Sequence, residues 1–255
     1  LLSGVIVVVV GIPLSRLVRF SPEPYGYLPD GDFYRPQVRG SSGLPQLTPN
    51  DRKPVSEAEY DFTVKEALKS SAFWVMSIGH AVALLSISAL GLHLVAYLQT
   101  ELDFSTGEAA KVVMVLTGFN MVGQPLGGVL GDRYPKKYIA FFTLVGHCIG
   151  LLLLATADSF LGIMVGVIIQ GAAWGIRGPV LTSMRGEFFG RKSFPMIMGF
   201  SNTIMMVGMI IGPLVAGFMA DQYSYRSGFL IIAAAVGVGS FLFLFLKKPC
   251  HPATI

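Results

Sequence analysis

The amino-acid sequence predicts an all-α membrane protein with six complete transmembrane helices. Hydrophobic residues make up 53% of the 255 residues and charged residues only 13%, whereas an ordinary soluble domain carries about 25% charged residues. The charges are also unevenly spread, because 16 of the 34 charged residues fall within residues 15–69 and only 18 serve the other 200. Long uncharged stretches therefore dominate the rest of the chain, and this pattern excludes a water-soluble fold.

Six stretches are long enough to cross a bilayer as helices. A helix rises 1.5 Å per residue, so a hydrocarbon core of about 30 Å needs about 20 apolar residues. The five stretches without Asp, Glu, Lys or Arg are 70–100, 112–131, 138–157, 193–220 and 227–246. A sixth lies between Asp158 and Arg185 and is interrupted only by Arg177. All are apolar throughout instead of alternating, which favours helices over barrel strands, and we expect a six-helix domain over residues 70–246.

The first 15 residues are apolar but span only about 21 Å as a helix, which falls short of the bilayer. We interpret residues 1–15 as the end of a transmembrane helix that begins upstream. A signal peptide would carry its basic residues ahead of the apolar run, whereas here Arg16 and Arg19 follow it.

Residues 16–69 are expected to form a cytoplasmic loop. Seven prolines lie between Pro22 and Pro54, with glycine and serine among them, and such a composition resists a packed core. A short surface helix is expected near 63–70, because Thr63 and Glu66 have the spacing of a capping box.

The basic residues indicate the orientation of the chain. When the loops are assigned alternately to two sides, 16 of the 19 Lys and Arg residues fall on one side; Lys111 and Arg226 fall on the other, and Arg177 lies inside a span. Cytoplasmic loops hold the excess of Lys and Arg, so the 16–69 loop and the tail 247–255 are expected in the cytoplasm, at a plasma membrane or bacterial inner membrane. The net charge of +4 then reflects membrane topology, and no nucleic-acid partner is expected.

The turn after the second complete span carries the first recognisable motif. Residues 128–137 read GVLGDRYPKK and resemble the cytoplasmic-loop signature G-x-L-x-D-R-x-G-R-K of the major facilitator superfamily. The segment has Lys136 in place of the signature's arginine and Pro135 in place of its glycine. It matches the signature at Gly128, Leu130, Asp132, Arg133 and Lys137.

A glycine-proline pattern on the fifth complete span resembles the signature on the fifth span of a superfamily half. Glycines at such spacings let any membrane helices approach closely, which explains the glycines but not the Gly-Pro register. Ala216 replaces the first glycine of the final pair. The pattern consists of Gly199, Gly208, Gly212, Pro213 and Gly217.

The flanking segments resemble those of monocarboxylate-porter-like and oxalate/formate-antiporter-like members. The stretch from Arg19 to Gly31 is similar to the one after their sixth helix, and FFGRKSF at 188–194 is similar to the loop before their eleventh. The resemblance implies the end of helix 6 followed by helices 7–12, which is the six-helix C-terminal half of the fold. An N-terminal half would be its partner within the bilayer.

The resemblance also implies secondary active transport by alternating access, in which one half rocks against the other around a midplane site. Asp132 would dock near a helix N-terminus of the other half, where unpaired amides favour an anion. Gly128, Arg133, Lys136 and Lys137 would complete this conformational latch, and the glycine-proline span would serve packing and gating.

Arg177 is the first candidate for a substrate site, since an ionised side chain within a span is costly and tends to face a cavity or a partner. A guanidinium suits a carboxylate, which favours a small organic anion such as a monocarboxylate as substrate. The alternative is a structural arginine paired with carbonyls or with the other half. Weaker candidates, for which an interhelical hydrogen bond is the alternative, are Asn120, Gln124, Gln170, His93 and Asn202.

Other functions have less support in the sequence. Motifs of intramembrane hydrolases and phosphate-binding loops are missing from it, so no enzyme, cofactor or metal site is expected. No Asp or Glu lies inside a span, so proton coupling would take its carboxylate from the other half, and a counter-anion is equally open. A carrier of drugs or sugars, or a non-transporting or half-size membrane protein acting as a homodimer, is the alternative.

Overall fold

The computed structural model describes residues 9, 12–13, 61–190 and 192–249. The chain divides into two units, Leu1–Ala58 and Glu59–Ile255. In the first unit only Val9, Ile12 and Pro13 are described, and all three are helical. The rest of the helix expected over residues 1–15, most of the 16–69 loop and the end of the 247–255 tail lie outside the described residues.

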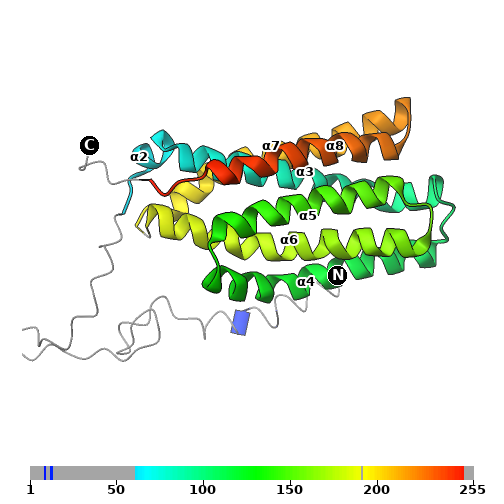
Figure 1. The fold of residues 1–255 in the computed structure, drawn as a ribbon, viewed down its shortest axis with the longest axis horizontal. Coiled ribbons are helices and arrows are strands. Elements are labelled where there is room, and N and C mark those ends of the chain that lie inside the picture. The colour runs from blue at the N-terminus through cyan, green and yellow to red at the C-terminus, as the bar shows by residue number, and fades with distance from the viewer. Residues whose placement is uncertain (1–8, 10–11, 14–60, 191, 250–255) are drawn as a thin grey trace, which may run out of the picture. The chain divides into compact units, whose positions relative to one another are not determined.

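Six helices in the described part of the second unit are long and apolar enough to cross a membrane, which confirms the all-helical membrane fold predicted from the sequence. A short helix, α2 (Val64–Lys69), precedes them. The last span continues from α8 into the 3-10 helix η2 (Phe241–Phe245). The long helices, labelled in Figure 1, are α3 (Ser71–Thr100), α4 (Thr106–Arg133), α5 (Lys136–Thr156), α6 (Phe160–Phe189), α7 (Phe194–Gln222) and α8 (Tyr225–Ser240).

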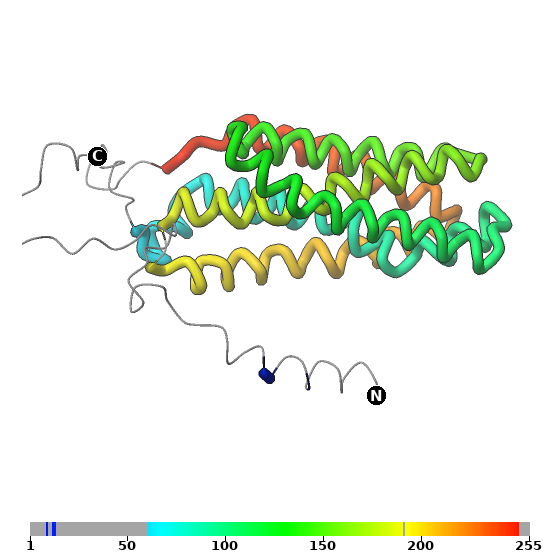
Figure 2. The backbone as a smooth tube through the Cα atoms, turned by 90° about the horizontal axis from the view of Figure 1, so that it is seen from below, coloured from blue at the N-terminus to red at the C-terminus, as the bar shows by residue number. Residues whose placement is uncertain are grey.

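Polar residues in the short turns fix where the helices begin. At α4, the Ser105 hydroxyl accepts from the Glu108 backbone N–H, and the Glu108 carboxylate accepts from the Ser105 backbone N–H. Thr63 and Glu66 form the same capping box at the start of α2. Both arrangements satisfy amides that have no partner within the helix. The turns are too short to cross the bundle, so successive helices run antiparallel along one long axis (Figure 2).

Glycines bring α4 and α6 into close contact. A Cβ atom on Gly175 of α6 would collide with the Asn120 carbonyl oxygen and lie 2.8 Å from the Gly123 Cα atom. A Cβ atom on Gly127 of α4 would collide in the same way with the Ile176 carbonyl oxygen. Small residues let membrane helices approach until their backbones touch, so α4 and α6 form a tightly packed pair.

A second tight pair joins α3 and α7, again through glycine. A Cβ atom on Gly208 of α7 would collide with the Ala81 carbonyl oxygen, and one on Gly212 with that of Leu85. The pairs are linked through α5, which packs on α6 and on α8. Direct contact between α3 and α6 is sparse by comparison. Figure 1 shows α3, α7 and α8 grouped on one side and α4, α5 and α6 on the other.

The basic residues gather at one end of the bundle. The helix directions place α2, the turn between α4 and α5, the C-terminal end of α6 and Lys247–Lys248 at that end (Figure 1). At the opposite end, Arg226 of α8 donates to Asp158 at 2.5 Å and lies 4.0 Å from Glu101. This asymmetry agrees with the positive-inside pattern, while the assignment of the basic end to the cytoplasm stays a prediction.

Candidate functional site

Arg177 lies in the middle of α6 and is buried within the six-helix unit. Only 2% of its surface is exposed, and its Nε and Nη1 atoms have no hydrogen-bond partner among the described residues. Removing a charged group from water costs several kcal/mol unless a counter-charge and hydrogen bonds replace the water. Among the described residues, the buried Arg177 guanidinium therefore has two nitrogen atoms, Nε and Nη1, that can still donate hydrogen bonds to a ligand.

The helical period gives the direction in which Arg177 points. Gln170, seven residues before it, shares one side of α6 with it because two turns take about 7.2 residues, whereas Arg185, eight residues after it, lies roughly 80° further around the helix. Gln170 Nε2 donates to Ser86 Oγ of α3 at 3.2 Å. Arg185 Nη2 donates to the Met76 carbonyl oxygen of α3 at 3.2 Å. Arg177 thus lies between two polar bridges, on the side of α6 that faces α3.

Arg185 was not predicted as part of this site. The charge pattern assigns Arg185 to the loop after the fourth complete span, yet α6 continues to Phe189 and only 1% of Arg185 is exposed. Its Nη2 atom also lies 3.3 Å from His80 Nδ1 of α3, and its Nη1 atom donates to the Leu181 carbonyl oxygen at 3.4 Å. Moving one residue from loop to span leaves 15 basic residues opposite two, so the predicted asymmetry stays large. The signal available in the sequence was its spacing of eight residues from Arg177.

Two histidines lie near these polar bridges, between the two groups of helices. His147 of α5 is fully buried, and neither of its ring nitrogens has a hydrogen-bond partner among the described residues. His80 Nδ1 of α3 is within hydrogen-bond distance of Arg185 Nη2. We call Ser86, Gln170, Arg177, Arg185, His80 and His147 the polar seam. It joins α3, α5 and α6 where the packing of α3 against α6 is sparse.

The remaining sequence-derived candidates lie apart from this seam. His93 Nε2 is 3.1 Å from the Pro213 carbonyl oxygen, a contact between α3 and α7. Gln124 Nε2 donates to Asn120 Oδ1 at 3.2 Å along α4, where Asn120 is buried and Gln124 is exposed. Asn202 is exposed on α7. The structure therefore groups Gln170 with Arg177, pairs Asn120 with Gln124 on α4, and leaves His93 and Asn202 at two further places.

The glycine-proline pattern of α7 has a different environment at each position. Gly208 and Gly212 pack on the α3 backbone, whereas a Cβ atom on Gly199 would meet nothing within 4 Å. A Cβ atom on Gly217 would lie 3.4 Å from the His93 ring. Pro213 lies inside α7, and proline removes a backbone donor there, which leaves a carbonyl one turn back without its helical partner. Close packing explains two of the four glycines.

The loop signature occupies the turn between α4 and α5. Asp132 and Arg133 end α4 and are exposed, and the Asp132 carboxylate makes no hydrogen bond or ion pair with any residue in the described ranges. Lys136 forms an ion pair with Glu187 of α6, while Lys137 Nζ lies 4.9 Å from the centre of the Tyr138 ring. A carboxylate at a helix C-terminus is disfavoured by the helix dipole, so Asp132 gains by meeting a positive group elsewhere.

Gly128 belongs to the same signature and is exposed on α4, where a Cβ atom would meet nothing within 4 Å. The described part of the second unit therefore gives no packing reason for glycine at this position.

Comparison with known proteins places these features in a family. The family model described as Major Facilitator Superfamily matches residues 76–254. Among curated proteins, the chain is 33% identical over 97 residues to the tetracycline resistance protein, class H, of Pasteurella multocida, covering 38% of this chain and 24% of that protein. It is 27% identical over 142 residues to the quinolone resistance protein NorA of Staphylococcus aureus, covering 56% of this chain and 36% of that protein.

Solved structures show the same fold. A crystal structure of the peptide transporter POT in complex with sulfate superposes with a TM-score of 0.61 at 19% identity, covering 71% of this chain and 41% of that one. The complex with alafosfalin gives 0.62 at 18% identity. The matched part of the chain thus covers less than half of each of these proteins. Because the family model covers most of the chain, from within the first span to beyond the last, the protein belongs to the Major Facilitator Superfamily.

Proposed function

We propose that the protein is a secondary transporter that works by alternating access and carries a small organic anion, with Arg177 holding the carboxylate. The observation that supports this substrate class is the buried guanidinium of Arg177, whose Nε and Nη1 atoms have no partner among the described residues. A carboxylate fits a guanidinium through two parallel hydrogen bonds. A bound carboxylate would supply the negative charge and the hydrogen-bond acceptors that the Arg177 guanidinium lacks among the described residues.

The packing supports this location for a binding site. The glycine-packed pairs α4–α6 and α3–α7 have touching backbones, whereas α3 and α6 are joined mainly by the polar side chains of the seam. Polar bridges exchange their partners for a ligand more readily than interlocked backbones separate. The seam is therefore the place within this half where a small polar ligand enters with the least disruption.

Asp132 and its neighbours are proposed as the latch between this half and an N-terminal half. Asp132 is exposed at the C-terminus of α4, and Arg133 beside it is also exposed. The positive N-terminus of a helix in the other half would suit the carboxylate. Lys136 is held by Glu187, so of the two lysines in the motif Lys137 is the better placed to contribute.

The test is uptake of a radiolabelled monocarboxylate by full-length protein reconstituted in vesicles. Arg177→Gln is expected to lower uptake at low substrate concentration by roughly 100-fold, because two charge-assisted hydrogen bonds are lost. Arg177→Lys should retain part of it. Arg226→Gln is the matched control, since it removes one positive charge at the far end of the bundle and should change uptake by less than about twofold. Unchanged carboxylate uptake in Arg177→Gln would reject the anion site.

A carrier of drugs is the second candidate, and the similarity to a tetracycline resistance protein and to a quinolone resistance protein favours it. Cells expressing the full-length protein are exposed to either compound, and its accumulation is compared with that in cells lacking the protein. Lower accumulation that does not depend on Arg177, together with no carboxylate uptake, would support a drug carrier over an organic-anion carrier.

A further inference from the structure

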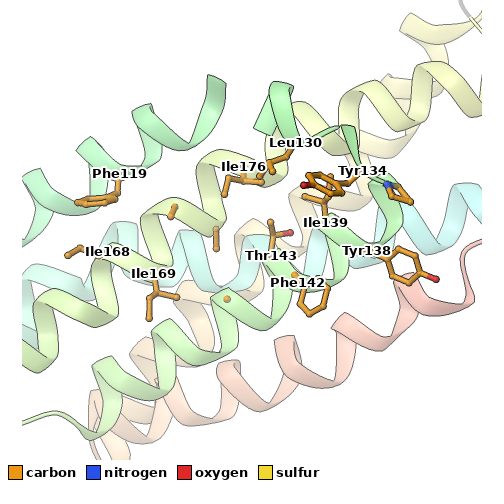
Figure 3. Close-up of a pocket in the computed structure, with 14 residues that line it drawn as sticks. Phe119, Leu130, Tyr134, Tyr138, Ile139, Phe142, Thr143, Ile168, Ile169 and Ile176 are labelled. Atoms are coloured by element: carbon orange, nitrogen blue, oxygen red, sulfur yellow. The ribbon is translucent and has the colours of Figure 1, made fainter. Parts of the chain in front are cut away.

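An apolar groove runs along the side of the bundle, away from the polar seam. It has a volume of about 710 Å³ and lies between α4, α5 and α6. Figure 3 shows its side chains, with Phe119 at one end and Tyr134 and Tyr138 at the other. Among the lining side chains only Thr143 and the two tyrosines carry polar atoms. Phe119, Tyr138 and Phe142 are exposed, so the groove opens at the surface.

The depth of the groove matches one leaflet of a bilayer. Along α4 it extends from Phe119 to Leu130, which is about 16 Å of helix. The hydrocarbon core is about 30 Å thick, so the groove reaches from one membrane surface to near the midplane. The tyrosines lie at the outer end, at the depth where tyrosine is enriched in membrane proteins.

A basic hollow adjoins the outer end of the groove. It has a volume of about 470 Å³ and shares Tyr134 and Pro135 with the groove. Four lysines and one glutamate are its charged lining residues: Lys136, Lys137, Lys247, Lys248 and Glu187. Glu187 is paired with Lys136. The positive charges of Lys137, Lys247 and Lys248 are therefore available to an anion. Lys137 lies over the ring of Tyr138, which itself lines the groove, so cation and apolar surface meet at one point.

We propose that the groove and the hollow together bind one anionic phospholipid, with an acyl chain between α4, α5 and α6 and the phosphate headgroup among Lys137, Lys247 and Lys248. The groove suits the apolar acyl chain and the hollow suits the anionic headgroup, and the two lie along the membrane normal in the same order as the parts of a bilayer lipid. The apolar part has the depth of a leaflet, and the positive part lies at the membrane surface. Basic pockets between transmembrane helices are suited to anionic headgroups. This inference is independent of the substrate proposed above.

The experiment measures lipid binding to full-length protein in detergent. Phosphatidylglycerol is compared with phosphatidylcholine, which has no net charge, and with glycerol phosphate, which has the anionic headgroup chemistry without acyl chains. Native mass spectrometry counts bound lipid, and thermal unfolding reports the accompanying shift in Tm. Unaltered protein is expected to retain one phosphatidylglycerol preferentially and to unfold at a higher temperature with it than with either comparison compound.

Two variants divide the site into its parts. The triple variant Lys137→Gln, Lys247→Gln and Lys248→Gln is expected to weaken phosphatidylglycerol binding by roughly 100-fold, because each lysine near an anionic surface contributes about fivefold. The matched control replaces Lys65, Lys69 and Lys192 by glutamine. These three lysines are exposed at the same end of the bundle, outside the lining of the hollow, and their replacement should leave binding within about twofold.

The second variant, Ala172→Phe, fills the groove while leaving every lysine in place, and it should also abolish retention of the lipid. Equal binding of phosphatidylcholine and phosphatidylglycerol, or undiminished binding in the triple lysine variant, would overturn the proposal. A Tm shift with glycerol phosphate as large as with phosphatidylglycerol would also overturn it, because the site would then serve a soluble anion. The triple lysine variant changes surface side chains, so its result stands even if Ala172→Phe does not fold.

Discussion

Adding a single methyl group at Gly175 is expected to force α4 and α6 apart. The new Cβ atom would lie 2.8 Å from the Gly123 Cα atom and 3.0 Å from the Asn120 carbonyl carbon, and it would collide with the carbonyl oxygen of Asn120. Ordinary Cβ contacts begin at about 3.4 Å. All three atoms belong to the α4 backbone, so a change of side-chain rotamer does not relieve the contact, and the whole helix must move.

The size of the effect follows from two opposing terms. Overpacking of a well-packed interior costs about 1–3 kcal/mol, and here the rigid neighbours favour the upper part of that range. Replacing glycine by alanine inside a helix stabilises the helix by up to about 1 kcal/mol, because alanine loses less backbone conformational freedom on folding. Gly175→Ala is therefore expected to lower the free energy of unfolding by about 1–2 kcal/mol.

Gly118→Ala is the matched control because Gly118 lies on the partner helix α4, and a Cβ atom there meets nothing within 4 Å. It should leave stability unchanged or raise it by up to about 1 kcal/mol. Unfolding by sodium dodecyl sulfate in mixed micelles, followed by circular dichroism, measures both variants under the same conditions. If the two substitutions had the same effect, backbone contact at Gly175 would not be what holds α4 and α6 together.

Three further substitutions test other parts of the fold. Asp132→Asn removes a carboxylate from the C-terminus of α4 and should raise the free energy of unfolding by about 0.3–1 kcal/mol; in the uptake assay it should lower transport, and retained transport would count against the latch. Gly190→Ala should cost about 1–3 kcal/mol in thermal or denaturant unfolding, since Gly190 has φ +76° and its Cβ would collide with Asp61; no loss would show that this turn adjusts freely. Ser105→Ala should cost about 0.5–2 kcal/mol by removing the cap of α4, whereas the neighbouring Thr106→Ala, measured in the same way, should change stability much less.

The number and order of the spans were predictable because hydropathy decides which segments enter a bilayer. The ends of the helices were less predictable, because a helix ends where its backbone groups find hydrogen-bond partners outside the helix and not where the first charged residue occurs. Helix α4 starts at Thr106, ahead of Lys111, because Ser105 and Glu108 cap it there. Helix α6 extends beyond Arg185 to Phe189. For α4 and α6, the charge-free stretch therefore locates the apolar middle of the helix and underestimates its length.

Of the residues at the candidate site, Arg177 was the first candidate in the sequence and Gln170 a weaker one. A charge inside an apolar stretch is visible in one sequence, whereas its neighbours depend on which helices pack together. Gln170 and Ser86 are 84 residues apart in sequence and 3.2 Å apart in space, and no spacing along the chain encodes that contact. The same reason explains why the glycines of α7 differ, since Gly208 meets a backbone and Gly199 meets nothing.

The packing links these observations to the proposed mechanism. Where glycines let backbones interlock, as between α4 and α6, separation exposes polar peptide groups in a medium without water, and each unsatisfied group costs several kcal/mol. Where side chains form the contact, as at Gln170 and Ser86, a ligand offering an acceptor replaces what is lost. Arg177 lies at a contact of the second kind with donors still unpaired. These unpaired donors, held between two rigid helix pairs, are the reason why we propose a negatively charged substrate, whose charge and acceptors would complete the environment of the guanidinium.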